Sequence, residues 1–116
     1  MADVLVDTDV LIDHLRGHRP FDPGPDRVFC SVITRGELFA GTGTDEDAVR
    51  RLLAPLVEVL VDRDLAEAAG RLRRTTRIPM PDAVIAATAL SLGAPLVTRN
   101  KRDFGRVKGL RVRAPR

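Results

Sequence analysis

Short apolar runs alternate along the chain with segments whose apolar residues recur every three or four positions. The runs predict strands, and the segments between them predict amphipathic helices. The expected strands cover residues 4–6, 28–30, 57–61, 95–98 and 110–112. Strands that alternate with helices are typical of an α/β fold in which right-handed crossovers build a parallel sheet. The pattern therefore predicts a central parallel sheet flanked by helices.

Polar residues directly before the helical segments predict where those helices begin. The expected N-caps are Thr8 or Asp9, Ser31, Thr44 with Asp47 in a capping box, and Asp62. Pro79 and Pro81 open a helix that ends at Gly93, since proline is favoured at the first helical positions. Gly36 lies inside the second helical segment, where it costs about 1 kcal/mol relative to Ala, and this predicts close packing there. Residues 99–104 are expected to form a polar turn.

The length and composition limit the kinds of protein to consider. With 116 residues, the chain is expected to form one domain over residues 1–116. Aromatic residues make up 3%, and Trp and Tyr are missing, which disfavours binding of single-stranded nucleic acid by aromatic stacking. The 19 Lys and Arg residues exceed the 16 Asp and Glu residues, for a net charge of +3. This balance favours a polyanionic partner, RNA or DNA first, although a solvated surface explains it equally well.

The single cysteine and the N-terminal residues bear on the compartment. Cys30 lies in an apolar run, and we expect a buried thiol. One cysteine allows no disulfide framework, which is typical of a reducing compartment. The first residues lack the basic region and the apolar stretch of a signal peptide, and no segment is long and apolar enough to span a membrane. The expected location is the cytoplasm.

Four carboxylates lie next to the ends of expected strands. Asp7 follows the first strand, Glu37 lies in the helix after the second, Asp82 precedes the fourth and Asp103 follows it. Each has an ordinary explanation: a helix cap, an exposed helical residue, an acid at a helix N-terminus and a turn residue, respectively. Thr8 or Asp9 can cap the first helix, however, which leaves Asp7 free for another role. A parallel sheet would gather all four side chains at one edge.

Gathered carboxylates need a positive counterpart. Two charges about 4 Å apart repel by roughly 4 kcal/mol at an effective dielectric near 20, so such a cluster must hold protons or bind a hard cation. Oxygen ligands with no converging His or Cys favour Mg²⁺ or Mn²⁺. His14 and His18 flank a loop, and we expect them at the surface.

Four segments in this order resemble the motifs of PIN-domain ribonucleases, in particular the VapC-type toxins of type II toxin–antitoxin (VapBC) pairs. The segments are Val6–Ile12, Arg35–Gly41, Pro81–Ala89, and Val97–Asn100 with Asp103–Phe104. The resemblance spans nearly the whole chain and implies a PIN-like three-layer α/β fold with a central parallel sheet flanked by helices. Two departures stand out: Asp9 replaces the Asn or Ser of many members, and residues 71–81 are a few residues short.

The resemblance also implies a function: a Mg²⁺- or Mn²⁺-dependent endoribonuclease toxin that cleaves RNA phosphodiesters with a metal-activated water. The implied catalytic quartet is Asp7, Glu37, Asp82 and Asp103. We expect Asp7 and Asp82 to ligate the main ion, with Glu37 and Asp103 acting through water or a second ion. The expected supporting residues are Thr8, Thr98 and Asn100. Basic residues beside the site, Arg99, Lys101 and Arg102, either hold RNA phosphates or form a solvated turn.

The partners follow from the same resemblance. A VapB-type antitoxin would occupy the toxin's groove, RNA would be the substrate, and two toxin chains would form a homodimer. DNA would be contacted only indirectly through the antitoxin, and no membrane partner is expected.

Two other interpretations fit part of the pattern. A phosphoryl-accepting receiver domain would use Asp7 and Asp9, with Asp62 as the acceptor and Thr98 after the fourth strand. It leaves Glu37 and Asp82 without a role, and no convincing Lys follows a fifth strand. A PIN-like fold that only binds partners is the other, and the intact quartet argues against it. Asp62→Ala distinguishes the receiver from the ribonuclease, because it should inactivate a receiver and spare a ribonuclease.

Overall fold

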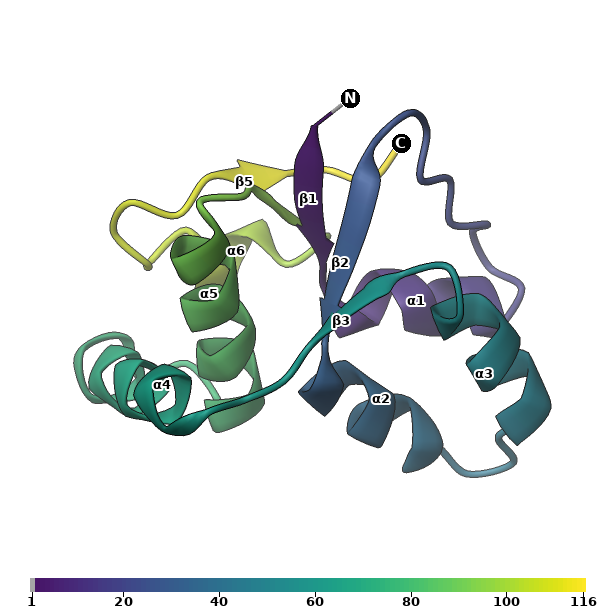
Figure 1. The fold of residues 1–116 in the computed structure, drawn as a ribbon, viewed down its shortest axis with the longest axis horizontal. Helices are drawn as coiled ribbons and strands as arrows, with labels where there is room; N and C mark the ends of the chain where they lie inside the picture. Colours follow the sequence, from purple (N-terminus) through teal and green to yellow (C-terminus); the bar gives the residue numbers. More distant parts are fainter. Residues whose placement is uncertain (1) are drawn as a thin grey trace.

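The computed structural model describes residues 2–116, in which five strands and six helices alternate (Figure 1). The strands are β1 (Asp3–Val6), β2 (Arg27–Ser31), β3 (Val57–Val59), β4 (Leu96–Val97) and β5 (Val112–Arg113). The helices are α1 (Thr8–Leu15), α2 (Val32–Phe39), α3 (Glu46–Leu53), α4 (Arg63–Thr76), α5 (Met80–Leu92) and α6 (Lys101–Phe104). The predicted order of strands and helices is confirmed, with differences at the ends of several elements.

The five strands form one parallel sheet in the order β3-β2-β1-β4-β5. From β1 the chain builds outward through β2 to β3, and it then returns to place β4 against the other side of β1. The strand order therefore reverses between β1 and β4. In open α/β sheets the crevice beyond the carboxyl ends of the strands at such a reversal is the usual ligand site.

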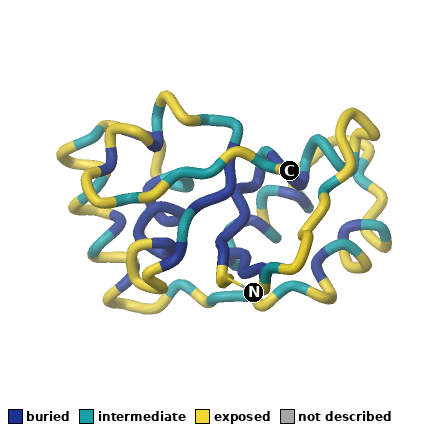
Figure 2. Tube along the Cα trace, turned by 90° about the horizontal axis from the view of Figure 1, so that it is seen from above, coloured by how far each residue is buried: buried dark blue, intermediate teal, exposed yellow. Residues whose placement is uncertain are grey.

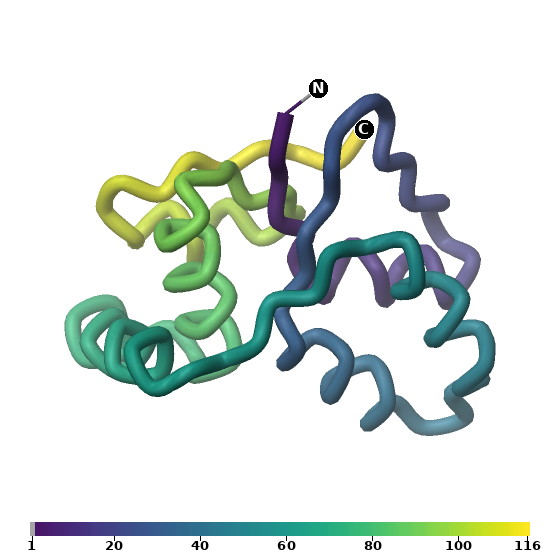
Figure 3. The backbone as a smooth tube through the Cα atoms, in the orientation of Figure 1, coloured from purple at the N-terminus to yellow at the C-terminus, as the bar shows by residue number. Residues whose placement is uncertain are grey.

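Helices cover both faces of the sheet, which confirms the three-layer α/β prediction. In Figure 1, α1, α2 and α3 lie on one side of the sheet, and α4, α5 and α6 lie on the other. Side chains alternate between the two cores: Val4 and Val6 of β1 pack with the first group, and Leu5 packs with the second. After β3 the chain crosses from one helical layer to the other (Figure 3). Figure 2 shows buried residues in the centre and exposed residues mainly around it.

The middle of helix α5 is buried because it lies between the sheet and α4. Residues 83–89 are all buried, and α4 packs along the helix. In residues 71–81, the segment that is a few residues short, α4 ends at Thr76 and its C-cap Arg77 turns the chain in a left-handed conformation (φ 63°). Pro79 then begins α5, as predicted, and Gly93 ends it. This tight turn brings the first turn of α5, with Asp82, to the carboxyl edge of the sheet.

Two of the predicted helix starts and the role of Gly36 were wrong. The N-cap of α1 is Asp7, not Thr8 or Asp9, and the N-cap of α3 is Asp45, whose carboxylate accepts from the Ala48 amide. The Thr44 hydroxyl instead donates to main-chain carbonyls. Ser31 and Asp62 do cap α2 and α4 as predicted. Apart from its chain neighbours and the backbone of its own helix, no atom lies within 4 Å of where a Cβ of Gly36 would be, so close packing does not explain that glycine.

Residues 101–104, predicted as part of a polar turn, form the short helix α6. It begins because the Asn100 side chain accepts a hydrogen bond from the Asp103 amide at 3.3 Å. Cys30 is buried, as expected. None of the helices within residues 2–116 combines the length and apolar character needed to cross a bilayer.

Candidate active site

Asp7 joins the two central strands at their carboxyl ends. Its Oδ1 accepts from the Thr8 amide at 2.8 Å, which caps α1, and its Oδ2 accepts from the Thr98 hydroxyl at 2.7 Å just after β4. The residue is only 4% exposed. The capping explanation is therefore correct for one carboxylate oxygen, while the other faces the junction of β1 and β4.

The surroundings of Asp7 disfavour its charge. The pKa of this carboxyl is raised to about 8, mainly by burial and also by the negative charges of Asp9 and Asp82. The Thr98 hydroxyl opposes this rise by donating to the carboxylate. A carboxyl group with such a pKa carries a proton at neutral pH unless a cation replaces that proton.

Glu37 is oriented by two buried hydroxyl groups. The Thr8 hydroxyl donates to Glu37 Oε1 at 2.7 Å and lies 2.9 Å from the Thr34 hydroxyl. Because the single Thr8 proton points at Glu37, Thr34 is the donor in the second contact. Thr34 is fully buried in α2. The chain of hydroxyls therefore directs a helical carboxylate toward the end of β1.

Asp82 lies in the first turn of α5 and is half-buried. Burial raises its pKa to about 6, and Glu37, Asp103 and Asp9 each add a repulsive contribution. These influences come from α2, α6 and α1, so carboxylates from four helices act on one another at this edge of the sheet. The predicted gathering of Asp7, Glu37, Asp82 and Asp103 into one electrostatic cluster is what the fold produces.

Asn100 and Thr98 connect Asp103 to the rest of the cluster. The Asn100 amide side chain donates to Asp103 Oδ2 at 3.2 Å, and the Asn100 main-chain amide donates to the Thr98 hydroxyl at 2.9 Å. Thr98 in turn donates to Asp7. A continuous hydrogen-bonded path therefore runs from Asp103 through two of the predicted supporting residues, Asn100 and Thr98, to Asp7.

Asp9 is a fifth carboxylate of the site. Its Oδ2 accepts from the Arg99 amide at 3.3 Å and lies 3.5 Å from the Thr98 hydroxyl, whose proton is already directed at Asp7. Its Oδ1 is buried and has no hydrogen-bond partner within residues 2–116. An unpaired buried carboxylate oxygen is costly, and a cation bound to it would remove that cost.

The donor chemistry of the cluster fits a hard divalent cation, because it consists of carboxylate oxygens and includes the unpaired Oδ1 of Asp9. As the side chains stand, no three His, Cys, Asp or Glu side chains within residues 2–116 are arranged to hold one ion. Hydroxyl or amide donors engage Asp7, Glu37 and Asp103, and mutual repulsion separates the charges. Binding an ion therefore requires side-chain rotation within the cluster.

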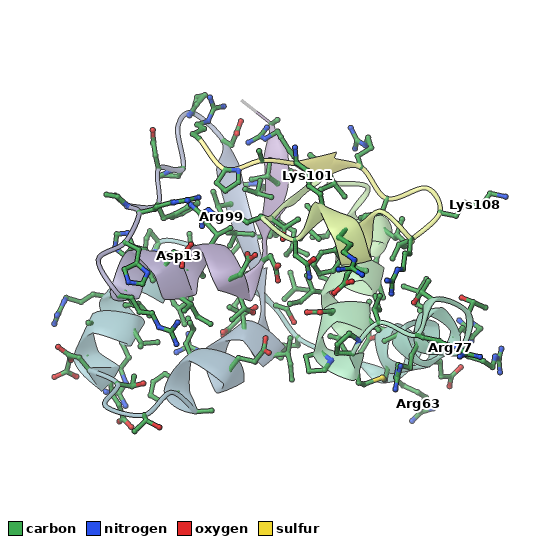
Figure 4. All side chains as sticks on the ribbon, turned by 180° about the vertical axis from the view of Figure 1, so that it is seen from behind. Asp13, Arg63, Arg77, Arg99, Lys101 and Lys108 are labelled. Atoms are coloured by element: carbon green, nitrogen blue, oxygen red, sulfur yellow. The ribbon has the colours of Figure 1, made fainter. Side chains whose placement is uncertain are left out.

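The three predicted RNA-binding residues differ in their surroundings. Arg99 Nη1 lies 2.9 Å from Asp13 Oδ2 on α1, and its side chain is 22% exposed. Lys101 and Arg102 begin α6 and are exposed. Figure 4 shows Arg99 and Asp13 beside α1, with Lys101 nearer the centre of the view.

Comparisons with known proteins identify the family of the chain. The sequence matches the family described as PIN domain over residues 4–110. The chain belongs to the PIN-domain family. Ribonuclease VapC19 of Mycobacterium tuberculosis is 34% identical to this PIN domain over 113 residues, covering 86% of this chain and 90% of the relative. This similarity places the chain in the VapC group.

Solved structures show the same fold. A toxin-antitoxin complex from Klebsiella pneumoniae contains a chain with a TM-score of 0.79 and 32% identity, covering 92% of this PIN domain and 94% of that chain. VapBC2 from Rickettsia felis, bound to a DNA fragment from its promoter, gives a TM-score of 0.80 at 19% identity with full coverage of both chains. The second likeness concerns the fold alone.

The receiver interpretation is wrong. A receiver sheet has the strand order 2-1-3-4-5, with the third strand inside the sheet, whereas β3 of this PIN domain is an edge strand. Asp62, the residue that would accept the phosphoryl group, is exposed and caps α4. Its position at an edge explains why it does not meet Asp7 and Asp9.

Sequence analysis did not include Thr34 or Asp13 among the residues of the site. Thr34 lies one helical turn before Glu37, so a hydroxyl on the same side of α2 could have been noticed. The Asp13–Arg99 ion pair joins residues far apart in the chain, and no local pattern signals it. Asp9 was considered as a possible cap, as a departure from the family pattern and as part of the receiver interpretation, but not as a member of the ribonuclease site.

Proposed function

We propose that this PIN domain is a divalent-metal-dependent endoribonuclease and the toxin of a type II toxin–antitoxin pair. Residues 1–116 would act as a single nuclease domain in the cytoplasm. The observation that carries this proposal is the cluster of carboxylates around Asp7 and Asp82, whose pKa values are raised to about 8 and about 6. Its family supports the choice of RNA, since the M. tuberculosis relative is named a ribonuclease.

In this proposal Asp7 and Asp82 hold Mg²⁺ or Mn²⁺, and Glu37 and Asp103 complete the site through water or a second ion. When bound, the ion supplies an activated water and charge stabilisation at the phosphate. The chain's own residues orient the carboxylates: Thr98 fixes Asp7, Thr8 and Thr34 fix Glu37, and Asn100 fixes Asp103. The last contact keeps Asp103 turned toward the cluster.

RNA cleavage is expected to require Mg²⁺ or Mn²⁺ and to stop in excess EDTA, because no other group in the cluster can both activate water and neutralise the phosphate. Initial rates on labelled RNA, measured with each ion, with EDTA and after the ion is restored, test this. Restored cleavage excludes damage to the protein by the chelator. Undiminished cleavage in excess EDTA would show that the metal assignment is wrong.

Thr34→Val is expected to raise the Mg²⁺ concentration for half-maximal cleavage about tenfold, as the loss of residues that orient metal ligands does. The substitution keeps the shape and removes the hydroxyl that supports Thr8 and Glu37. Thr88→Val is the matched control, since the Thr88 hydroxyl is equally buried but donates to Val84 of its own helix. Thr34→Ser keeps the hydroxyl and should therefore need the same Mg²⁺ concentration for half-maximal cleavage as the wild type. Equal Mg²⁺ titrations for both Val variants would remove Thr34 from the site.

We further propose that a VapB-type antitoxin occupies the groove of this toxin, that two toxin chains form a homodimer, and that DNA is contacted only through the antitoxin. The similar chains come from a toxin–antitoxin complex and from a VapBC pair bound to promoter DNA.

Expression of this chain alone is expected to arrest growth, because free toxin would cleave cellular RNA, and co-expression of the adjacent antitoxin should relieve the arrest. Growth curves with both plasmid combinations measure this effect. Asp82→Asn, expressed to the same soluble level, is the control and should allow growth. Normal growth with abundant soluble wild-type protein would count against the toxin role.

A further inference from the structure

A groove rich in cationic residues borders the acidic cluster on the β4–β5 side of the sheet. It has a volume of about 360 Å³. Its lining consists of Arg19, Arg99, Lys101, Arg116, Thr98, Ala114 and Pro115. Thr98 joins the groove to the cluster, because its hydroxyl donates to Asp7. The groove therefore adjoins the residue that holds Asp7.

The ion pairs around the groove leave part of its positive charge uncompensated. Arg99 is paired with Asp13. Arg116 shares Asp26 with Arg113, at 3.3 Å and 2.6 Å, so two guanidinium groups face one carboxylate. Within residues 2–116, Arg19 and Lys101 have no carboxylate at ion-pair distance. Both side chains are exposed and available to an anionic ligand.

The paired arginines build the walls of the groove. Arg99 ties the segment between β4 and α6 to α1 through Asp13. Arg116 ties the C-terminal residues to the loop before β2 through Asp26, and the chain end lies beside that loop in Figure 1. The walls come from three distant parts of the chain, so the spacing of Arg19 and Lys101 depends on the folded structure.

We propose that this groove holds the phosphate backbone of the RNA substrate beside the cleaved bond, with Arg19 and Lys101 as the direct contacts. No aromatic residue lines the groove, so bases find no aromatic ring to stack on there, and we expect phosphate contacts to carry most of the binding. The inference rests on the proposed function for the identity of the strand. Compared with the RNA contacts predicted from the sequence, it adds Arg19 as a direct phosphate contact. It removes Arg99 from that role, because Asp13 already engages Arg99.

The test measures binding without cleavage. In an Asp82→Asn background with EDTA, a fluorescent oligouridylate of about twelve nucleotides is titrated at several salt concentrations. Arg19→Gln combined with Lys101→Gln should weaken binding by up to about fivefold per substitution, because exposed ion pairs are weak. The slope of log affinity against log salt should become shallower by about 0.7 per lost phosphate contact on single-stranded RNA.

Arg63→Gln combined with Lys108→Gln is the matched control. It removes the same charge at the opposite end of the molecule from Arg99 and Asp13 (Figure 4), and affinity and slope should stay close to those of the parent. Equal losses in both double variants would overturn the groove assignment, because net charge alone would explain them. So would tighter binding of an oligoglutamate peptide than of RNA, lost with Arg19 and Lys101, which would assign the groove to an acidic protein.

The two proposals fail in different ways. If the wild-type protein cleaves no RNA with any divalent ion, but the groove variants still lose affinity and slope relative to the control, the nuclease proposal fails and the groove stands. If the wild-type protein cleaves RNA while the groove variants bind like the control, only the groove assignment is wrong. In the active protein, the groove variants should raise KM and leave kcat within about twofold, as expected for uniform binding.

Discussion

Asp82→Asn is expected to lower kcat for RNA cleavage by about a thousandfold, because metal-ion catalysis contributes several kcal/mol and each 1.36 kcal/mol is about tenfold in rate. The substitution keeps the shape of the side chain and removes the charge needed to bind the ion. Asp82 lies in the first turn of α5, where an acid contributes about 0.3–1 kcal/mol through the helix dipole. Repulsion by Glu37, Asp103 and Asp9 offsets that contribution, so the variant should fold.

Asp64→Asn is the matched control for this experiment. Asp64 also lies in the first turn of a helix, α4, but it is exposed and outside the cluster. Its variant should cleave RNA at the wild-type rate. Circular dichroism and thermal unfolding of both variants establish that the fold is kept. More than a tenth of the wild-type rate in folded Asp82→Asn, at saturating metal, would contradict its role as a ligand.

Most of the fold could be predicted because its signals are local. The apolar runs of β1 and β2 are buried on both faces, and Ser31 and Asp62 precede their helices as caps. Local signals fail where two neighbouring residues can both act as the N-cap of a helix. Asp7 competes with Thr8 and Asp9 as a cap, and Asp45 competes with Thr44. The tertiary position of each side chain decides which acceptor meets the free amide groups.

The acidic cluster could be anticipated because parallel strands bring their carboxyl ends to one edge. Its internal contacts could not, since they join residues far apart in sequence. The Thr8–Thr34 contact spans 26 residues, and the Thr98–Asp7 contact spans 91. Only the folded chain shows that Thr34 supports Glu37, that Asp9 has an unpaired oxygen, and that Asp13 engages Arg99.

Without divalent cations, the protein is expected to lose a few kcal/mol of its free energy of unfolding between about pH 4 and about pH 8. The pKa of Asp7 rises from 3.8 in the unfolded chain to about 8 in the fold, and that of Asp82 rises to about 6. Between these values the folded state binds more protons than the unfolded state. Stability is therefore greatest below the unfolded pKa, and it falls as pH rises through about 6 for Asp82 and about 8 for Asp7.

Denaturant unfolding in EDTA across this pH range measures the loss, and Asp7→Asn serves as the comparison. Asn is also a good helix cap, so this variant should be more stable than the wild type in alkaline buffer and should depend less on pH. Mg²⁺ at about a hundred times its dissociation constant should raise wild-type stability by about 2.7 kcal/mol, and the variant should gain much less. Parallel pH curves for the two proteins would show that the buried carboxyl of Asp7 is not protonated at neutral pH. A Mg²⁺ effect confined to the wild type would indicate that the residue that weakens the fold at high pH is the residue that binds the ion.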